Sequence, residues 1–76
     1  MRSHSMIVGM NIRRVRKSAG WTQEKLAVNT QLSSDYISRL ELGKENPTLD
    51  VLVRISACLH FEIGELFRPL ETNSKG

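Results

Sequence analysis

Apolar and polar residues recur along this chain with the three- and four-residue spacing of amphipathic helices, and glycines and prolines divide it into segments of helical length. The first segment, about residues 6–18, has one apolar stripe: Val8, Ile12, Val15 and, just beyond it, Ala19. Gly20 follows this stripe, at the position where a glycine commonly ends a helix. The pattern therefore predicts a first helix that ends before Gly20.

Two shorter helices are predicted next, over residues 23–30 and about 34–42. Thr22 and Ser33 precede them, and both are residue types whose hydroxyl oxygens cap a helix N-terminus. Gly43 ends the second of these helices. Their inner sides carry Leu26, Ala27, Thr30, Ile37 and Leu40.

A fourth helix is predicted over about residues 49–59, with Thr48 as its cap after the turn at Asn46 and Pro47. One stripe of this helix contains Leu49, Leu52, Ser56 and Leu59, and a second contains Val51, Ile55 and Cys58. A short fifth helix is expected at about residues 63–67. The expected fold is therefore all-α, with five helices in one domain over residues 6–70. Residues 1–5 are expected to be a leader or a disordered N-terminus before Met6, and residues 71–76 a disordered polar tail.

The composition is that of one small, mildly basic domain. The chain has 76 residues, of which 39% are apolar, and its formal charge is +3 at pH 7. Residues 1–44 contain eight Lys or Arg and three Asp or Glu, a balance of +5. Residues 45–76 contain three and five respectively, a balance of −2. This asymmetry predicts a basic working face, and a polyanion such as a nucleic acid is a candidate partner.

Several functional classes are disfavoured. A single cysteine, Cys58, excludes an internal disulfide and a multi-cysteine zinc site, and it fits a reducing, cytoplasmic setting. No segment has the roughly 20 apolar residues of a membrane span, and no signal peptide is found. Cys58 and His60 would lie about 200° apart on a helix, so they cannot form a nucleophile–base pair. We expect no enzyme, no cofactor and no metal.

The spacing within residues 22–44 favours one arrangement of helices. Two short helices are joined by about four residues, a small Ala27 permits a close crossing, and Ile37 and Leu40 anchor the second helix to the core. This is the arrangement of a helix-turn-helix, whose second helix enters the major groove of DNA. The alternative from spacing alone is any small helical bundle with a tight turn between two helices.

Three blocks of sequence closely resemble the lambda-repressor-like (Xre/Cro-type) helix-turn-helix family. They are WTQEKLA at residues 21–27, LSSDYISRLELGK at 32–44 and NPTL at 46–49. The resemblance covers about residues 8–68. It implies a five-helix domain that binds double-stranded DNA sequence-specifically, usually as a homodimer on a palindromic operator. Phage repressors, restriction–modification controller proteins and antitoxin-type regulators include free-standing domains of this kind.

The resemblance also assigns roles to individual residues. Gln23 matches a glutamine that contacts a phosphate and braces the recognition helix, and Thr22 matches its phosphate-facing neighbour. Lys44 matches a position that contacts the DNA backbone, and Arg16 and Glu41 match a pair that often forms a salt bridge between the first and third helices. The positions that match those contacting base edges are Ser34, Asp35, Ser38 and Arg39.

Side-chain chemistry refines these roles. Arg39 is the strongest candidate for base readout, because arginine pairs with guanine O6 and N7. Its alternative partners are a phosphate or Asp35, and we expect Asp35 to orient Arg39 from one helical turn away. Tyr36 either donates its hydroxyl to a phosphate or packs beside the core.

Two helix ends depart from the family pattern. Gln31 and His60 stand where the family usually has glycine. A non-glycine residue in the left-handed region costs about 1 kcal/mol, so we expect the turn at Gln31 to be distorted or longer.

Surplus apolar residues near the fourth and fifth helices predict a homodimer interface, which matches the need for two DNA half-sites. The candidates are Val51, Ile55, Cys58, Phe61, Ile63 and Phe67. The alternative is that they complete the core of the monomer. A rival function for the whole domain is a protein-interaction module, such as an antitoxin-like binder, with weak or no DNA binding.

Overall fold

A computed structural model of the chain describes residues 4–69. Over these residues the fold is all-helical, as predicted: it contains four α-helices and one 3₁₀-helix, and no strand. The elements are α1 (His4–Ser18), α2 (Gln23–Thr30), α3 (Ser34–Glu41), α4 (Leu49–Leu59) and η1 (Ile63–Phe67). The predicted bounds of α2 and α4 are confirmed.

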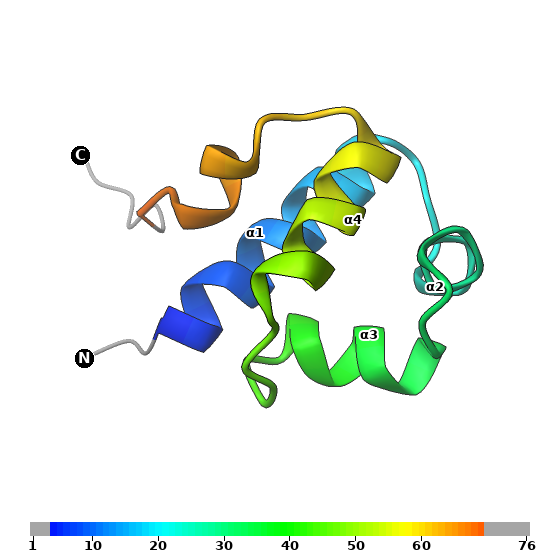
Figure 1. The fold of residues 1–76 in the computed structure, drawn as a ribbon, viewed down its shortest axis with the longest axis horizontal. Coiled ribbons are helices and arrows are strands. Elements are labelled where there is room, and N and C mark those ends of the chain that lie inside the picture. Colours follow the sequence, from blue (N-terminus) through cyan, green and yellow to red (C-terminus); the bar gives the residue numbers. More distant parts are fainter. Residues whose placement is uncertain (1–3, 70–76) are drawn as a thin grey trace.

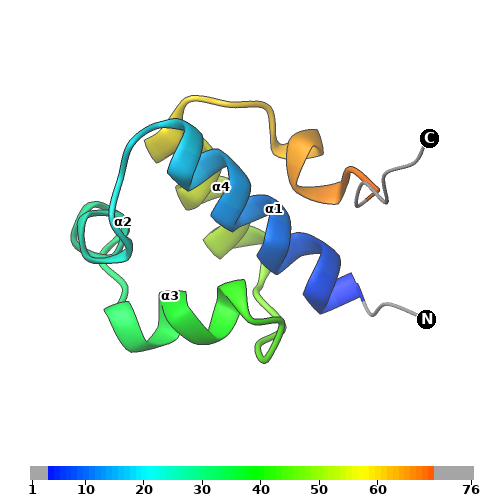
Figure 2. The same ribbon diagram turned by 180° about the vertical axis from the view of Figure 1, so that it is seen from behind.

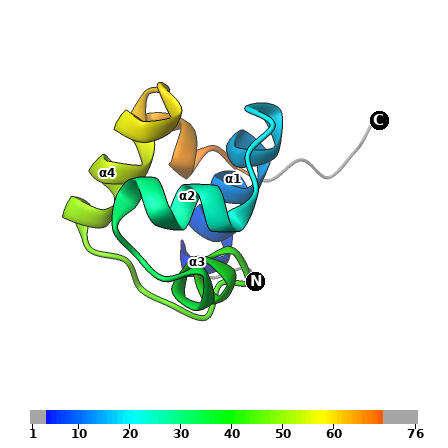
Figure 3. The same ribbon diagram turned by 90° about the vertical axis from the view of Figure 1, so that its right-hand side faces the viewer.

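The helices pack around one hydrophobic core. In Figure 1, α4 lies in front of α1, α3 runs along the lower edge and α2 is seen end-on. Figure 2 shows from behind that α1 connects the region of η1 to the region of α2. Figure 3 shows α2 lying across α3. In this arrangement α1 packs against α3 and η1, and α2 packs against α3 and α4. The fully buried side chains are Ile12, Leu26, Ile37, Leu40, Ile55 and Leu66.

Hydroxyl caps set the beginnings of three helices, as predicted. The Thr22 hydroxyl accepts the Lys25 N–H at 3.0 Å, and the Ser33 hydroxyl accepts the Tyr36 N–H at 3.0 Å. Thr48 accepts the N–H of Val51 at 3.2 Å. Each cap satisfies a backbone donor that the helix itself leaves without a partner, which fixes where the helix starts.

The beginning of the chain differs from the prediction. α1 begins at His4, two residues before the predicted start at Met6. The Ser5 hydroxyl donates to the side-chain oxygen of Asn46, in the segment between α3 and α4. The exclusion of residues 4 and 5 from the fold is therefore wrong. Residues 1–3, and the predicted tail at residues 71–76, lie outside the described residues.

The fifth element is a 3₁₀-helix and not the α-helix expected from the sequence. The Glu65 N–H donates to the Glu62 carbonyl three residues earlier, at 2.9 Å, and the Glu62 side chain makes no cap. Five residues are too few to build an α-helical ladder without a cap, whereas one 3₁₀ turn suits this length. Asn11 holds the turn in place, because its side-chain amide donates to the carbonyls of Leu66 at 3.0 Å and Arg68 at 2.8 Å.

A glycine that the sequence analysis did not identify permits the crossing of α1 and α3. Gly9 is buried, and a Cβ placed on it would overlap the carbonyl oxygen of Leu40 in α3. A side chain of any size would therefore push the two helix backbones apart. The close contact places the end of α3 directly on α1.

The residues of the two apolar stripes predicted for α4 differ in how deeply they are buried. Ile55 is fully buried, so its prediction as a dimer-interface residue is wrong. Cys58 shares that stripe, is half-buried and donates its thiol to the Asn29 carbonyl of α2 at 3.4 Å. In the other stripe Leu52 is buried, but Leu49 is 69% exposed. The stripe with Val51, Ile55 and Cys58 faces the core and α2, and the uncovered apolar side chains of α4 lie on its other flank.

Candidate nucleic-acid interface

The turn between α2 and α3 has a compact left-handed geometry. Gln31 lies in the left-handed region with φ 61° and ψ 36°, and its N–H donates to the Val28 carbonyl at 3.3 Å. The Leu32 N–H donates to the Ala27 carbonyl at 2.9 Å. The expected distortion or lengthening is therefore wrong, because a glutamine adopts the conformation that the family fills with glycine. His60 does the same after α4, with φ 59°.

A buried ion pair joins α1 to the end of α3, as predicted. The Arg16 Nε lies 2.6 Å from Glu41 Oε2, and its Nη2 lies 3.0 Å from Oε1. The remaining nitrogen of Arg16 donates to the Trp21 carbonyl at 2.7 Å. Both side chains are almost fully buried, so this two-pronged pair is shielded from solvent and its geometry is fixed.

Gln23 extends this ion pair to the first turn of α2. Its side-chain amide donates to Glu41 Oε1 at 3.0 Å. The predicted bracing role of Gln23 is therefore confirmed, whereas its contact with a phosphate stays a prediction. Glu41, which belongs to α3, thus accepts hydrogen bonds from side chains of both α1 and α2. One carboxylate fixes the relative positions of three helices.

The residues of α3 that were predicted to contact bases differ in their exposure to solvent. Ser34, Asp35 and Arg39 are exposed, and Ser38 is half-buried. Tyr36 is also half-buried and packs against the core. Burial raises the pKa of its hydroxyl, and the nearby Glu45 carboxylate raises the pKa further. At neutral pH Tyr36 therefore keeps a proton that it can donate.

The partner of Arg39 is not the one expected. Its Nε donates to Glu45 Oε2 at 2.8 Å, across the end of α3. This hydrogen bond is the main reason why the pKa of Arg39 lies above its usual range. Asp35 makes no hydrogen bond or ion pair with Arg39, so the structure does not show the orienting contact that was predicted for it. The carboxylate that contacts Arg39 is Glu45, in the segment between α3 and α4.

Basic and polar groups surround this face. Thr22, at the N-terminus of α2, and Lys44, after α3, are both exposed. The Lys25 ammonium lies 4.5 Å from the centroid of the Trp21 ring, which holds it beside the first turn of α2. A helix N-terminus with nearby cations is a suitable site for a phosphate.

The basic half of the sequence does not form one continuous surface. Arg14 pairs with the Glu65 carboxylate of η1 at 3.3 Å and also donates to Asn11. It therefore belongs to the η1 side of α1. Within residues 4–69, four Lys or Arg side chains make no ion pair. Lys25 lies over the Trp21 ring, and the other three are Arg13, Lys17 and Lys44.

Metal binding and membrane insertion find no support in the described part of the chain. Among residues 4–69 no group of three or more His, Cys, Asp or Glu side chains could hold a metal ion. None of the helices in this range is long and apolar enough to cross a membrane.

Comparison with known proteins identifies the arrangement of α2 and α3. The family model described as Helix-turn-helix matches residues 12–66, which is most of the chain. The chain belongs to the helix-turn-helix family. This confirms the family predicted from the sequence blocks at residues 21–49.

Relatives of this family member include short and longer regulators. It is 34% identical over 70 residues to y4dJ of Sinorhizobium fredii, named as an uncharacterized HTH-type transcriptional regulator, with 92% of this chain and 91% of that one covered. It is 39% identical over 62 residues to the HTH-type transcriptional regulator SlrR of Bacillus subtilis, covering 80% of this chain but 41% of SlrR. The crystal structure of the restriction-modification controller protein C.AhdI from Aeromonas hydrophila matches with a TM-score of 0.79 at 30% identity. That match covers 83% of this chain and 96% of C.AhdI.

Two residues at or behind this face were missed from the sequence. Gly9 stands inside the predicted first helix, where glycine is unfavourable unless a backbone must approach closely, and that signal could have identified it. Glu45 follows the helix end at Gly43 by two residues, so helical spacing gave no indication that it meets Arg39.

Proposed function

We propose that this helix-turn-helix protein is a transcriptional regulator that binds double-stranded DNA with the outer face of α3, as a homodimer on a palindromic operator. The observation that carries the proposal is the buried contact of Arg16 and Gln23 with Glu41. This contact holds α2 and α3 in a fixed crossing while the outer face of α3 stays polar and exposed. The names of the similar proteins, which include transcriptional regulators and a controller protein, support the same function.

Positioning on the DNA backbone is assigned to the groups around α3. Thr22 and Gln23 begin α2, where backbone N–H groups point outward and attract a phosphate. Lys44 and Tyr36 lie at the other end and on the flank of α3, and each has a donor for a second phosphate. Such contacts set the register of the protein on the duplex and carry no sequence information.

Base readout is assigned to the exposed residues of α3. The two terminal nitrogens of Arg39 can donate to O6 and N7 of a guanine, the most common specific contact in the major groove. Because Glu45 holds Arg39, the Asp35 carboxylate is available to accept from the N4 amino group of cytosine. Ser34 and Ser38 can donate to or accept from base edges.

The proposed dimer uses a revised surface, which we call the α4–η1 patch: Leu49, Val53 and Phe67. These side chains are 69%, 49% and 54% exposed. Leu49 and Val53 share one flank of α4, because they are four residues apart. The other flank bonds to α2 through Arg54, which donates to the Thr30 carbonyl at 3.2 Å, and through Cys58.

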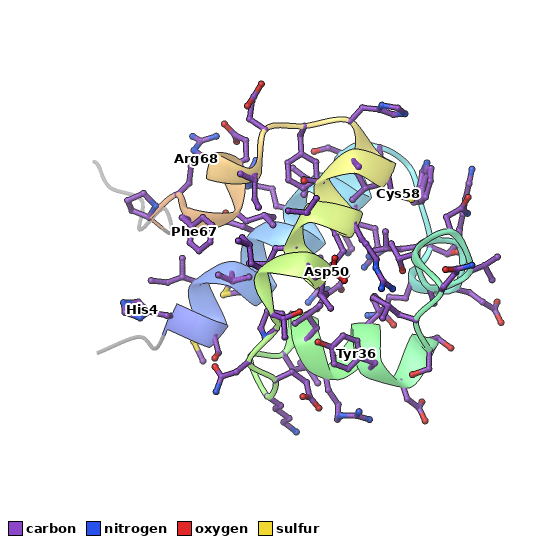
Figure 4. All side chains as sticks on the ribbon, viewed as in Figure 1. His4, Tyr36, Asp50, Cys58, Phe67 and Arg68 are labelled. Carbon is purple, nitrogen blue, oxygen red and sulfur yellow. The ribbon has the colours of Figure 1, made fainter. Side chains whose placement is uncertain are left out.

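The position of Phe67 suits a dimer that leaves the recognition helix free. Figure 4 shows Phe67 on η1, well separated from Tyr36 on α3. Phe67 borders a hollow of about 160 Å³ that Pro47 and Leu52 also line. Three of the residues first predicted for the interface, Val51, Phe61 and Ile63, are half-buried against the core, which leaves them less area for a partner.

In-vitro selection from a random duplex library at near-physiological salt tests this function. We expect an inverted repeat whose half-site centres lie about one helical turn apart. The affinity for the selected duplex should fall steeply as salt rises, because cations that contact phosphates displace counterions. Folded protein that selects no motif, and whose binding does not depend on salt, would contradict DNA recognition and favour the protein-interaction module.

A further inference from the structure

The contact between Glu45 and Arg39 has a consequence for specificity. Glu45 is outside α3, yet its carboxylate lies 2.8 Å from the Nε of the exposed Arg39 side chain. A carboxylate beside a surface that meets phosphates lowers affinity for any DNA through like-charge repulsion. It therefore needs a compensating role if the proposed function is correct.

The geometry of the guanidinium group suggests that role. An arginine has five N–H donors in a planar fork, and Glu45 engages the one on Nε. Among the described residues no partner occupies the two terminal nitrogens of Arg39. The edge that carries these two nitrogens is the edge that pairs with guanine O6 and N7. Glu45 thus holds Arg39 by one side and leaves the recognition edge uncovered.

We infer that Glu45 is a positioning residue for base readout, which directs Arg39 toward a base edge and disfavours its use as a general phosphate contact. This inference rests on the proposed function, because it names the residue that sets the specificity of the same site. A free arginine side chain has several rotatable bonds, and fixing it before binding reduces the entropy lost on contact. The negative charge of Glu45 also makes binding to unselected sequences less favourable.

The charges around Arg39 fit a specific contact better than a general one. On α3 the exposed charges are Asp35 and Arg39, and Glu45 adds a second carboxylate beside them. This small surface therefore has no excess positive charge. Arg13, Lys17 and Lys44 make no ion pair with described residues and can supply the nonspecific attraction. Attraction to DNA and readout of sequence are thus assigned to different cations.

The test compares binding to the selected operator, to single-base-pair variants of it and to a random duplex. The proteins are the wild type, Glu45→Ala, Arg39→Ala, the double variant and Glu24→Ala. Glu24 is an exposed carboxylate in the first turn of α2, so its loss changes the charge near the DNA without touching Arg39. Urea unfolding of each variant verifies that it is folded.

We expect Glu45→Ala to bind the random duplex severalfold more tightly and to lose at least fivefold of its preference at one base pair in each half-site. Glu24→Ala should also bind the random duplex more tightly but keep the preference. In the Arg39→Ala background, Glu45→Ala should not change the preference at all. A second readout uses no DNA: the Arg39 Nε–H resonance should shift and exchange faster with water in Glu45→Ala.

Three results would overturn the inference. The first is a Glu45→Ala variant that keeps the preference within twofold, and the second is the same loss of preference in the Arg39→Ala background. The third is an Arg39 Nε–H resonance that does not change. A wild-type protein without any sequence preference would instead refute the proposed function, and the inference with it.

Discussion

The α2–turn–α3 unit and the α4–η1 region are built from similar short helices but hold their polar and apolar groups in opposite ways. In the first unit, polar groups are inside: Glu41 of α3 meets Gln23 of α2 and the buried Arg16 of the neighbouring helix α1. In the second, apolar groups are outside: Leu49, Val53 and Phe67 are exposed. The first unit presents a polar outer face on α3, and the second leaves three apolar side chains uncovered.

This difference indicates a division of tasks. A recognition helix must keep its position to within a fraction of an ångström, and a buried two-pronged ion pair provides a directional constraint that apolar packing alone lacks. An apolar patch provides area and no such direction, which suits contact with a second copy.

The strongest test of the buried network is Glu41→Ala. We expect this change to lower the free energy of unfolding by about 3–5 kcal/mol, because it leaves the buried guanidinium of Arg16 without its partner. Glu45→Ala breaks the other ion pair at the end of α3, which is half-exposed, and should cost less than about 1 kcal/mol. Urea unfolding measures both. Equal losses would show that the buried pair has no special weight.

The crossing of α1 and α3 is tested by Gly9→Ala. The overlap with the Leu40 carbonyl should cost up to about 3 kcal/mol, and the better helix propensity of alanine should return about 1 kcal/mol. A net loss of about 2 kcal/mol is expected in urea unfolding. Gly64→Ala in η1 is the matched control, because a Cβ there would have no atom within 4 Å. Similar stabilities of the two variants would contradict the close crossing.

The α4–η1 patch is tested by Val53→Asp. Burying a carboxylate in a dimer contact should weaken self-association at least tenfold, or by about 1.4 kcal/mol, while the monomer stays folded. Val28→Asp introduces the same charge on α2, at a side chain that is 72% exposed and lies outside the patch. Sedimentation equilibrium measures the dissociation constants. A monomeric wild type at all concentrations, or equal effects of both variants, would remove the patch from the account.

The attachment of η1 through Glu65 is expected to have the smallest effect on the free energy of unfolding, and this effect depends on pH. Arg68 and Arg14 donate to the Glu65 carboxylate and hold its pKa below the usual 4.5. Because the pKa is lower in the folded state, this stabilisation is present above pH 4.5 and is lost as pH falls through the folded-state value. Glu65→Gln should therefore be less stable than the wild type at pH 6, and the difference in stability should shrink as the pH falls to 3.

Urea midpoints at the two pH values measure this difference. Glu62→Gln is the control, because the Glu62 side chain makes no cap to η1, and it should match the wild type at both pH values. A stability gap between Glu65→Gln and the wild type that is the same at pH 6 and pH 3 would contradict the pairing of Glu65 with the two arginines.

The contrast between the two regions also explains what could be predicted from the sequence. The bounds of α2 and its cap at Thr22 follow from local chemistry, and the ion pair of Arg16 with Glu41 was implied by the family resemblance. Local signals could not place Glu45 beside Arg39, because that contact depends on the path of the chain after α3. The exposure of Leu49 and the burial of Ile55 depend on how α4 is rotated against α2, which two adjacent apolar stripes leave ambiguous.

Repeating the selection with Arg39→Ala shows whether the outer face of α3 reads the DNA sequence, and Lys44→Ala is the control. The account predicts that Arg39→Ala loses about 1–3 kcal/mol of discrimination at one base pair of each half-site. Lys44→Ala should select the wild-type motif with lower affinity for every sequence and a smaller salt dependence. An unchanged motif for Arg39→Ala, with a uniform loss of affinity, would contradict readout of the DNA sequence by the outer face of α3.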